Sequence, residues 1–335
     1  MTHRIDVLAV GDIVSDTFIK LLDKEAEVDK DPIDKHPLLC MTYGTKVPFE
    51  YAIDIHGVGN SANAAVSCAR LGLRAALYSN IGKDELGRKM LAAMKQNKVQ
   101  TQYIHDHAGK VSNLHYVLWY EPDRTILIKH EQYDVSWPKI PKEDTPKWIY
   151  LSSIGENELH LQEDIADYLE KNPEVQLAFQ PGTFQMRLGF KKLARLMKQT
   201  DVFAVNKEEA QMMTGLKTNS IPELMQAIHD EGAGIVVITD GPNGSYASDG
   251  KRVLAMRSYP DPKPPFERTG AGDAFTSTFV AAIIKTGDIE TALKWGPINS
   301  MSVVQKVGAQ AGLLTESALL KLLKDAPKNY EPKEM

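Results

Sequence analysis

The chain has 335 residues, of which 43% are hydrophobic and 25% are charged, and these values are ordinary for a globular protein. Its formal net charge of -5 gives no basic surface for nucleic acid or an anionic membrane, so we expect neither kind of partner. The two cysteines, Cys40 and Cys68, are too few to indicate a disulfide framework or a Cys-rich zinc site.

Short runs rich in Val, Ile and Leu alternate along the chain with longer amphipathic runs. This alternation predicts an α/β fold with a mainly parallel central sheet that helices cover on both faces. The expected strands, in chain order, are Ile5–Val10, Ala75–Ile81, Trp148–Leu151, Val175–Phe179, Val202–Val205 and Ile235–Thr239. The expected helices include Ser61–Leu71, Glu85–Lys95, Glu163–Lys171, Phe190–Lys198, Ile221–Asp230 and Ala271–Lys285.

The sequence carries no signal for export or membrane insertion. The first apolar run, Ile5–Val10, gives way too quickly to polar residues to be a signal peptide. No apolar stretch approaches the roughly 20 residues that span a bilayer. We therefore expect a cytoplasmic protein.

Two segments depart from the α/β pattern. Leu38–Ile55 and Asn113–Glu131 contain alternating apolar and polar residues, which indicates hairpin-like strands. They predict a small β appendage, inserted at approximately residues 38–56 and 112–131 of a single domain that covers residues 1–325. Residues 326–335 are expected to form a frayed, polar C-terminal tail.

A glycine-rich segment, Thr269-Gly-Ala-Gly-Asp-Ala-Phe275, stands directly before an apolar helix. The backbone N–H groups of Gly270, Ala271 and Gly272 at a helix N-terminus can bind the charge of a transferring phosphoryl group. Asp273 would repel that phosphate, so its presence makes sense if it takes a proton from an attacking hydroxyl group. The alternative is an ordinary glycine-rich helix start in which Asp273 only complements the helix dipole.

Asn206-Lys-Glu-Glu209 follows the strand Val202–Val205 directly. An Asn and a Glu three residues apart in the first turn of a helix share one face, where their oxygens can hold a hydrated Mg2+. The alternative is an N-cap Asn followed by acidic residues that the helix dipole favours.

Thr239-Asp-Gly-Pro-Asn-Gly244 follows the strand Ile235–Thr239 and reads in isolation as a Gly/Pro turn. Its place at the carboxyl end of a strand is nevertheless where open α/β sheets bind ligands.

Near the N-terminus, Asp16 and Asn63 offer hydrogen-bonding groups that suit vicinal hydroxyls. A turn Asp and a helix-cap Asn are the alternatives. Arg124 either reaches a substrate from the β appendage or lies in solvent.

These motifs, in this order and over almost the whole chain, resemble the PfkB/ribokinase family of carbohydrate and nucleoside kinases. Thr269–Phe275 matches most of the family's C-terminal signature, Gly57–Gly87 resembles its N-terminal signature, and Asn206–Glu209 matches its N-x-x-E magnesium motif. The resemblance implies a ribokinase-like three-layer α/β/α sandwich in which the two β segments form a small lid that often serves as a dimer interface.

The resemblance also implies roles for individual residues. Asp273 would be the catalytic base, and Gly270, Ala271 and Gly272 would form the anion hole. Asn206 and Glu209 would organise Mg2+, mainly through water, together with the phosphates of ATP. The other residues implied at the ATP site are Thr239, Gly241, Gly244, Thr269, Asn299 and Gly308. Those implied at the substrate are Asp16, Gly59 and Asn63.

One departure from the family pattern concerns a monovalent cation. The family usually has Asp-Thr before the Thr of this signature, where that Asp helps to shape a monovalent-cation loop, whereas this chain has Glu267-Arg268. Activation by K+ is therefore in doubt.

The leading interpretation is an ATP-dependent kinase that phosphorylates a hydroxyl of a sugar or sugar-like small molecule. A nucleoside kinase is the alternative, in which Tyr43, Phe49 or Tyr116 would stack on the base. A second alternative is a catalytically silent sugar- or nucleotide-binding regulator.

Overall fold

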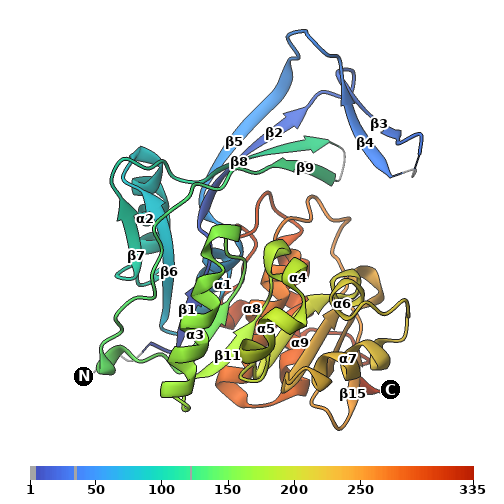
Figure 1. Cartoon of the computed structure of the whole chain (residues 1–335). Helices are drawn as coiled ribbons and strands as arrows, with labels where there is room; N and C mark the ends of the chain where they lie inside the picture. The colour runs from blue at the N-terminus through green and yellow to red at the C-terminus, as the bar shows by residue number, and fades with distance from the viewer. Residues whose placement is uncertain (1–4, 34–35, 121–122) are drawn as a thin grey trace.

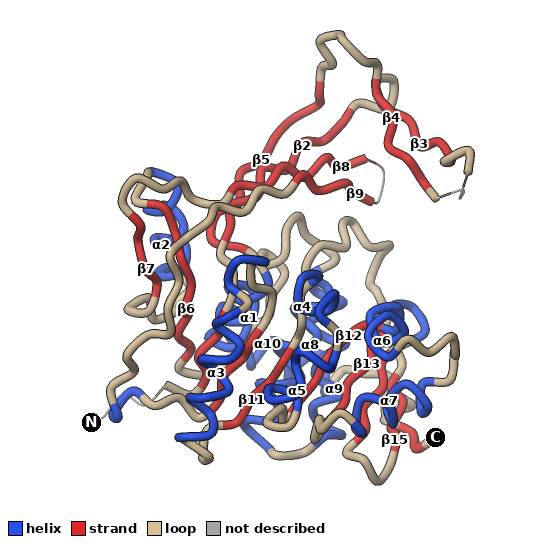
Figure 2. Tube along the Cα trace, in the orientation of Figure 1, coloured by secondary structure: helices blue, strands red, loops and turns tan. Residues whose placement is uncertain are grey.

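The computed structural model describes residues 5–33, 36–120 and 123–335. Its body is a ten-stranded sheet with the strand order β16-β15-β14-β13-β12-β11-β10-β1-β6-β7 (Figures 1 and 2). The six strands expected from the sequence form its centre, and adjacent members all pair in parallel. They are β1 (Val7–Val10), β6 (Ala75–Gly82), β10 (Trp148–Leu151), β11 (Gln176–Phe179), β12 (Val202–Asn206) and β13 (Ile235–Thr239).

Shorter strands extend the sheet at both edges. One edge carries β7 (Ile104–His107), which pairs with β6 in parallel. The other edge adds three antiparallel strands, which are β14 (Ser245–Ser248), β15 (Val253–Met256) and β16 (Lys333–Glu334).

Ten helices are described, and they form layers on the two faces of the sheet (Figure 2). They are α1 (Asn60–Arg70), α2 (Glu85–Gln96), α3 (His160–Lys171), α4 (Thr183–Leu188), α5 (Phe190–Met197), α6 (Lys207–Thr214), α7 (Ile221–Asp230), α8 (Ala271–Thr286), α9 (Ile289–Val303) and α10 (Glu316–Lys324). The helices expected from the sequence correspond to α1, α2, α3, α5, α7 and α8.

The core explains this layering. Successive residues of a strand point to opposite faces, so Phe203 and Ala204 of β12 belong to two different apolar clusters. One cluster packs against α3, α5, α6 and α7, and the other packs against α1, α8, α9 and α10. Because both faces are covered, the central strands are apolar throughout, and the expected three-layer α/β/α sandwich is confirmed.

The β appendage is larger than the sequence indicated. A four-stranded sheet of order β5-β2-β8-β9 stands above the carboxyl ends of the main strands (Figure 1), and we call it the lid. Its strands are β2 (Val14–Leu21), β5 (Phe49–Val58), β8 (Leu114–Tyr120) and β9 (Asp123–Leu127), and β3 (Ala26–Lys30) pairs with β4 (Pro37–Met41) beside it. The segment at 38–56 is therefore not one hairpin: β4 pairs with β3, while β5 pairs with β2.

The prediction of a frayed tail at 326–335 was wrong. Tyr330 is almost fully buried, and its hydroxyl donates a 2.8 Å hydrogen bond to the carbonyl of Lys294 in α9. Its ring also meets Tyr259 edge to face, and β16 then joins the main sheet. A single aromatic side chain thus anchors an otherwise polar terminus.

Within the described ranges, no helix combines the length and apolarity needed to cross a membrane.

Candidate active site

The carboxyl ends of the parallel strands bring several of the predicted residues to one edge of the sheet. Asn206 ends β12 and is the register partner of Thr239, which ends β13. Gln180 directly follows β11, and Gly11 directly follows β1. The lid lies above this edge, so the candidate site is bounded by the main sheet below and the lid above (Figure 1).

Asp273 lies in the first turn of α8, where three polar groups meet. Its Oδ2 accepts a 2.8 Å hydrogen bond from the Asn63 amide, and its Oδ1 accepts a 3.1 Å bond from the Gln180 amide. Burial raises the pKa of the Asp273 carboxyl, although these two hydrogen bonds favour its ionised form and oppose the shift. A carboxylate with a raised pKa and fixed orientation is suited to accept a proton.

Asn63 is held at both ends. Its Nδ2 donates to Asp273, and its Oδ1 accepts a 3.0 Å hydrogen bond from Gln310. Gln310 also donates to the carbonyl of Gly57. Asn63 therefore orients Asp273 in this structure, while a direct contact with substrate stays a prediction.

The start of α8 contains the three residues that were predicted to form an anion hole. Gly270 caps the helix with φ of 79°, and a Cβ atom there would lie 2.3 Å from the Cβ of Ala309, so only glycine fits. The N–H groups of Gly270 and Gly272 have no acceptor among the described residues, whereas Ala271 donates a long 3.4 Å bond to the carbonyl of Arg268. Free amide groups at the positive end of a 16-residue helix are available to an anion.

Asn206 and Glu209 form a reciprocal capping box at the start of α6. The Oδ1 of Asn206 accepts from the Glu209 N–H, and the Oε2 of Glu209 accepts from the Asn206 N–H, both at 2.8 Å. This capping box is the N-cap alternative that the sequence also allowed for Asn206. The capping box leaves the other carboxylate oxygen of Glu209 without a hydrogen-bond partner in the described part of the chain.

That arrangement is compatible with a hydrated Mg2+. Burial raises the pKa of Glu209, and the charge of Asp273 raises it further. Among the described residues, no group of three or more His, Cys, Asp or Glu side chains could hold a metal ion. Asn206 and Glu209 offer few oxygen ligands, and some of these oxygens already accept hydrogen bonds in the capping box. Such a site suits an ion that is bound largely through water and phosphate.

The 239–244 segment turns sharply after β13. Gly241 and Gly244 have φ of 50° and 106°, and a Cβ atom on Gly244 would lie 2.3 Å from the carbonyl of Met256. The glycines are therefore required by the turn itself. Their predicted contact with a nucleotide is not tested by this geometry.

Glu267 connects the anion-hole segment to the lid. Its buried carboxylate accepts from the N–H groups of Thr269, at 2.6 Å, and Gly308, at 3.3 Å. Arg124 of β9 lies 3.7 Å from the same carboxylate, so this lid arginine does not lie free in solvent. Beside it, Trp119 of the lid meets Phe266 edge to face at 5.2 Å.

Two residues predicted near the adenine are buried in this structure. Asn299 is fully buried, and its amide donates to Thr278 and accepts from the Leu314 N–H. Gly308 is buried against Ile55 of the lid, where a Cβ atom would approach within 2.4 Å. Their place near the adenine stays a prediction.

Asp16 and Gly59, which were predicted to bind the substrate, lie on the lid sheet and at the start of α1. Asp16 lies on β2 of the lid sheet rather than in a turn, and its Oδ1 is 3.5 Å from Nδ1 of His115. Gly59 caps α1 with φ of 106°, and a Cβ atom there would lie 2.8 Å from the carbonyl of Asp12.

Sequence reasoning missed Gln180 and Gln310, which hold the Asp273–Asn63 pair. Gln180 had a usable signal, because it is the first residue after a buried strand at the ligand-binding edge. Gln310 had no such sequence signal, because its contact with Asn63 joins residues far apart in the chain.

Comparisons with known proteins show the family of the chain. The family model for the pfkB family carbohydrate kinase matches residues 55–316. The chain is 27% identical to a 5-dehydro-2-deoxygluconokinase of Bacillus subtilis, over 79% of this chain and 86% of that one.

Solved structures support the fold. The structure of Arabidopsis thaliana ribokinase complexed with ribose and ATP is similar with a TM-score of 0.78 and 20% identity, covering 96% of this chain and 99% of that one. The structure of the Methanocaldococcus jannaschii nucleoside kinase is similar with a TM-score of 0.77 and 17% identity, and it also covers 96% of this chain and 99% of that one. The match to the family model, over residues 55–316, spans about three quarters of this chain and includes Asp273, Asn206 and Glu209. The chain therefore belongs to the pfkB family of carbohydrate kinases and is an ATP-dependent kinase.

Proposed function

We propose that the protein transfers the γ-phosphoryl group of ATP to a hydroxyl of a sugar or sugar-like small molecule, with Asp273 as the base. The observation that carries the proposal is the place of the Asp273 carboxylate, fixed by Asn63 and Gln180 beside free amide groups of α8. In the reaction, the hydroxyl oxygen bonds to the γ-phosphorus and its proton passes to Asp273. The bond from the γ-phosphorus to the bridging oxygen breaks, and ADP leaves.

The amide groups of Gly270, Ala271 and Gly272 would stabilise the charge that develops on the transferring group. Positioned donors at a helix N-terminus act without reorganisation during the reaction, which is why they are effective there. Kinases of this family use ATP with Mg2+, whose charge neutralises the phosphates. We propose that Asn206 and Glu209 hold the water shell of that ion, and that Thr239, Gly241, Gly244 and Thr269 line the nucleotide.

A nucleoside remains the alternative substrate. A nucleoside kinase is among the similar solved structures, although a likeness at 17% identity supports the fold alone. Tyr43, Phe49 and Tyr116 are exposed, so none of them forms a closed pocket for a base in this structure. A silent regulator is disfavoured because a protein that only binds its ligands has no use for an oriented base.

The test is Asp273→Asn, assayed by ADP release with a panel of sugars and nucleosides. We expect kcat to fall by roughly 100- to 10,000-fold, as for loss of a general base, while the KM for ATP changes little. Asp230→Asn, on the exposed end of α7, is the control. Turnover by Asp273→Asn at the wild-type rate would remove Asp273 from the mechanism, and a preference for nucleosides would replace the sugar assignment.

Two further proposals follow from the family resemblance. One is a homodimer formed through the lid, and the other is a cytoplasmic location.

A further inference from the structure

Each of the two amides that donate to Asp273 is itself held by a second residue. The Oε1 atom of Gln180 accepts a hydrogen bond from the hydroxyl of Tyr150, and the Oδ1 atom of Asn63 accepts a 3.0 Å hydrogen bond from the amide of Gln310. Two short chains of hydrogen bonds therefore end at the base, one on each of its carboxylate oxygens. We call them the Tyr150 chain and the Gln310 chain.

The direction of the Gln310 chain is fixed by a backbone carbonyl. The oxygen of Gly57 accepts a 2.7 Å hydrogen bond from Nε2 of Gln310, and a carbonyl oxygen can only accept. The same NH2 group of Gln310 therefore faces Asn63, whose side-chain oxygen accepts from it. The other end of the Asn63 amide, its NH2 group, is then the end that meets Asp273.

The Tyr150 chain follows from the pairing of two parallel strands. Tyr150 of β10 is the register partner of Ala178 of β11, and Gln180 comes two residues later. The Tyr150 side chain is fully buried, and burial raises the pKa of its hydroxyl, which therefore keeps its proton. Within the described ranges this hydroxyl donates to the Gln180 oxygen. A reversed Gln180 amide would take that acceptor away from a buried proton, which is unfavourable.

The orientation of the two amides bears on whether Asp273 can act as a base. An amide N–H stabilises an ionised carboxylate, whereas an amide oxygen in the same place repels it and favours the protonated acid. Burial raises the pKa of Asp273, and the hydrogen bonds from Asn63 and Gln180 oppose this shift. The ionised form of the base thus depends on amides that do not turn over.

The titratable neighbours of Asp273 cannot take over this task. Glu209 of α6 is the charged side chain that interacts with it, and both are acidic. Tyr150 of β10 and Cys68 of α1 both have a pKa that burial raises, so they stay neutral. Oriented dipoles, from these amides and from the start of α8, are therefore what favours the negative charge.

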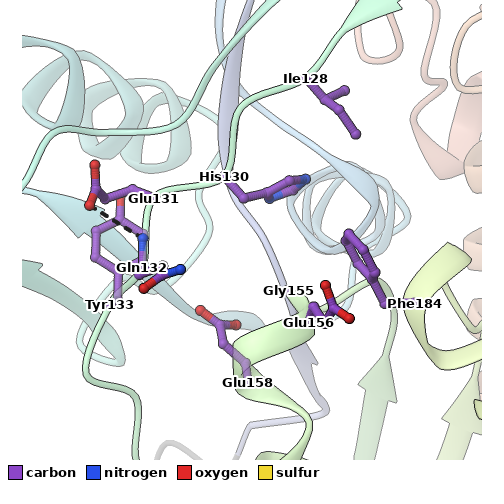
Figure 3. Close-up of a pocket in the computed structure, with 9 residues that line it drawn as sticks. All are labelled: Ile128, His130, Glu131, Gln132, Tyr133, Gly155, Glu156, Glu158 and Phe184. Atoms are coloured by element: carbon purple, nitrogen blue, oxygen red, sulfur yellow. Dashed lines mark hydrogen bonds between the residues drawn. The ribbon is translucent and has the colours of Figure 1, made fainter.

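The cavity next to the Gln180 segment offers no cation either. Gln180 is followed by α4, whose Phe184 lines a cavity of about 280 Å³ (Figure 3). The acidic residues Glu131, Glu156 and Glu158 line it, and no Lys or Arg of the described ranges does. A positive side chain that could replace the amide donors is thus missing from this lining as well.

We propose that Tyr150 and Gln310 are positioning residues for the base: they hold the amides of Gln180 and Asn63 with their N–H groups toward Asp273, which keeps it ionised. The inference rests on the proposed function, because it concerns how the base of that reaction is kept ready. Asp273 takes the proton of the substrate hydroxyl in each turnover. Amides locked as donors also favour its later release, because the protonated acid finds no acceptor in them.

The test is Tyr150→Phe, which removes one hydroxyl and keeps the ring. Tyr78→Phe is the matched control, because Tyr78 is a buried tyrosine of β6 in the same sheet whose hydroxyl donates to the carbonyl of Ser136. Gln310→Met interrupts the other chain and carries the test if Tyr150→Phe does not fold.

Two measurements are made on each variant. One is the pH profile of kcat/KM, and the other is the titration of the Asp273 carboxyl, followed by carbon-13 NMR of aspartate-labelled protein without substrate. Asp273→Asn identifies the signal. Thermal unfolding measures the loss of stability separately.

We expect Tyr150→Phe to lose roughly threefold more kcat/KM at pH 6 than at pH 8, with an unchanged KM for ATP and an Asp273 titration moved to higher pH. Gln310→Met should shift both measurements in the same direction. Because Tyr150 acts through Gln180, adding Tyr150→Phe to Gln180→Ala should change the profile no further. Tyr78→Phe should keep the wild-type profile even where its thermal stability falls.

The NMR titration keeps this inference separate from the proposed function. A shifted titration together with wild-type turnover by Asp273→Asn would overturn the role of Asp273 as the base and leave the effect of the two chains on its charge. Folded Tyr150→Phe and Gln310→Met variants that titrate like Tyr78→Phe would overturn the positioning role. So would a Tyr150→Phe loss that adds in full to that of Gln180→Ala.

Discussion

At the scale of single residues, the basicity of Asp273 is set by competing effects. Burial disfavours its ionised form, whereas the hydrogen bonds from Asn63 and Gln180 favour that form. Since a general base must be ionised to act, the pKa of Asp273 should set the pH below which kcat/KM falls. The raised pKa places this decline at a higher pH than an exposed aspartate would.

Gln180→Ala tests this balance. Loss of a hydrogen bond to the ionised carboxylate should raise the pKa of Asp273 further, so the variant should lose more activity at pH 6 than at pH 8. A hydrogen bond to a charged group is strong enough for a loss of roughly tenfold at the lower pH. The pH profile of kcat/KM measures this effect.

Gln176→Ala, at the exposed start of β11, is the control for Gln180→Ala, because Gln180 directly follows the same strand. A profile that keeps the wild-type shape and only drops in height would contradict the assigned effect on the Asp273 pKa.

At the scale of elements, local patterns predicted the body of the fold better than the lid. The central strands are short apolar runs and their pairing partners are similar runs, so their existence and parallel arrangement could be read from the sequence. In β2, by contrast, Ser15, Asp16 and Thr17 interrupt the apolar residues, and the strand pairs with residues about forty and one hundred positions away. Such pairing leaves no local signal, so the position of Asp16 within a strand could not be predicted from the sequence.

In the candidate site, too, local motifs could be predicted from the sequence and non-local contacts could not. The local motifs placed Asp273, Asn206 and Glu209 correctly at helix starts, because capping and glycine requirements act within a few residues. The contacts of Asn63 with Asp273 and Gln310 span more than two hundred residues, and only the folded structure reveals them. The same is true of Asn299, whose burial between α8 and Leu314 follows from packing.

The contact between Arg124 of β9 and Glu267 predicts how the lid acts. Arg124→Ala should weaken lid closure and leave the buried Glu267 carboxylate without its cation, raising the KM for the sugar by roughly fivefold. Steady-state kinetics with sugar and ATP varied separately measures this change.

Arg88→Ala is the matched control for Arg124→Ala, because it removes an exposed arginine that pairs with Glu85 on α2. Equal kinetics for the two variants would mean that the Arg124 contact does not stabilise the closed lid.

At the scale of the whole molecule, exposed apolar side chains gather on the lid. Tyr116 of β8 and Leu127 of β9 are register partners, and both are largely exposed. Val28, Met41 and Tyr43 are exposed near the β3–β4 pair. Exposed apolar surface can mark interaction sites, and the face of a lid sheet can bind a second copy by symmetry.

Leu127→Asp tests the proposed homodimer. A carboxylate in an apolar symmetric interface is buried twice, once in each copy, so the variant should sediment as a monomer at concentrations where the wild type is a dimer. Leu320→Asp on α10 is the control, since Leu320 is exposed to a similar degree but lies in the body. A wild type that sediments as a monomer, or a Leu127→Asp variant that remains dimeric, would show that this apolar surface has another role.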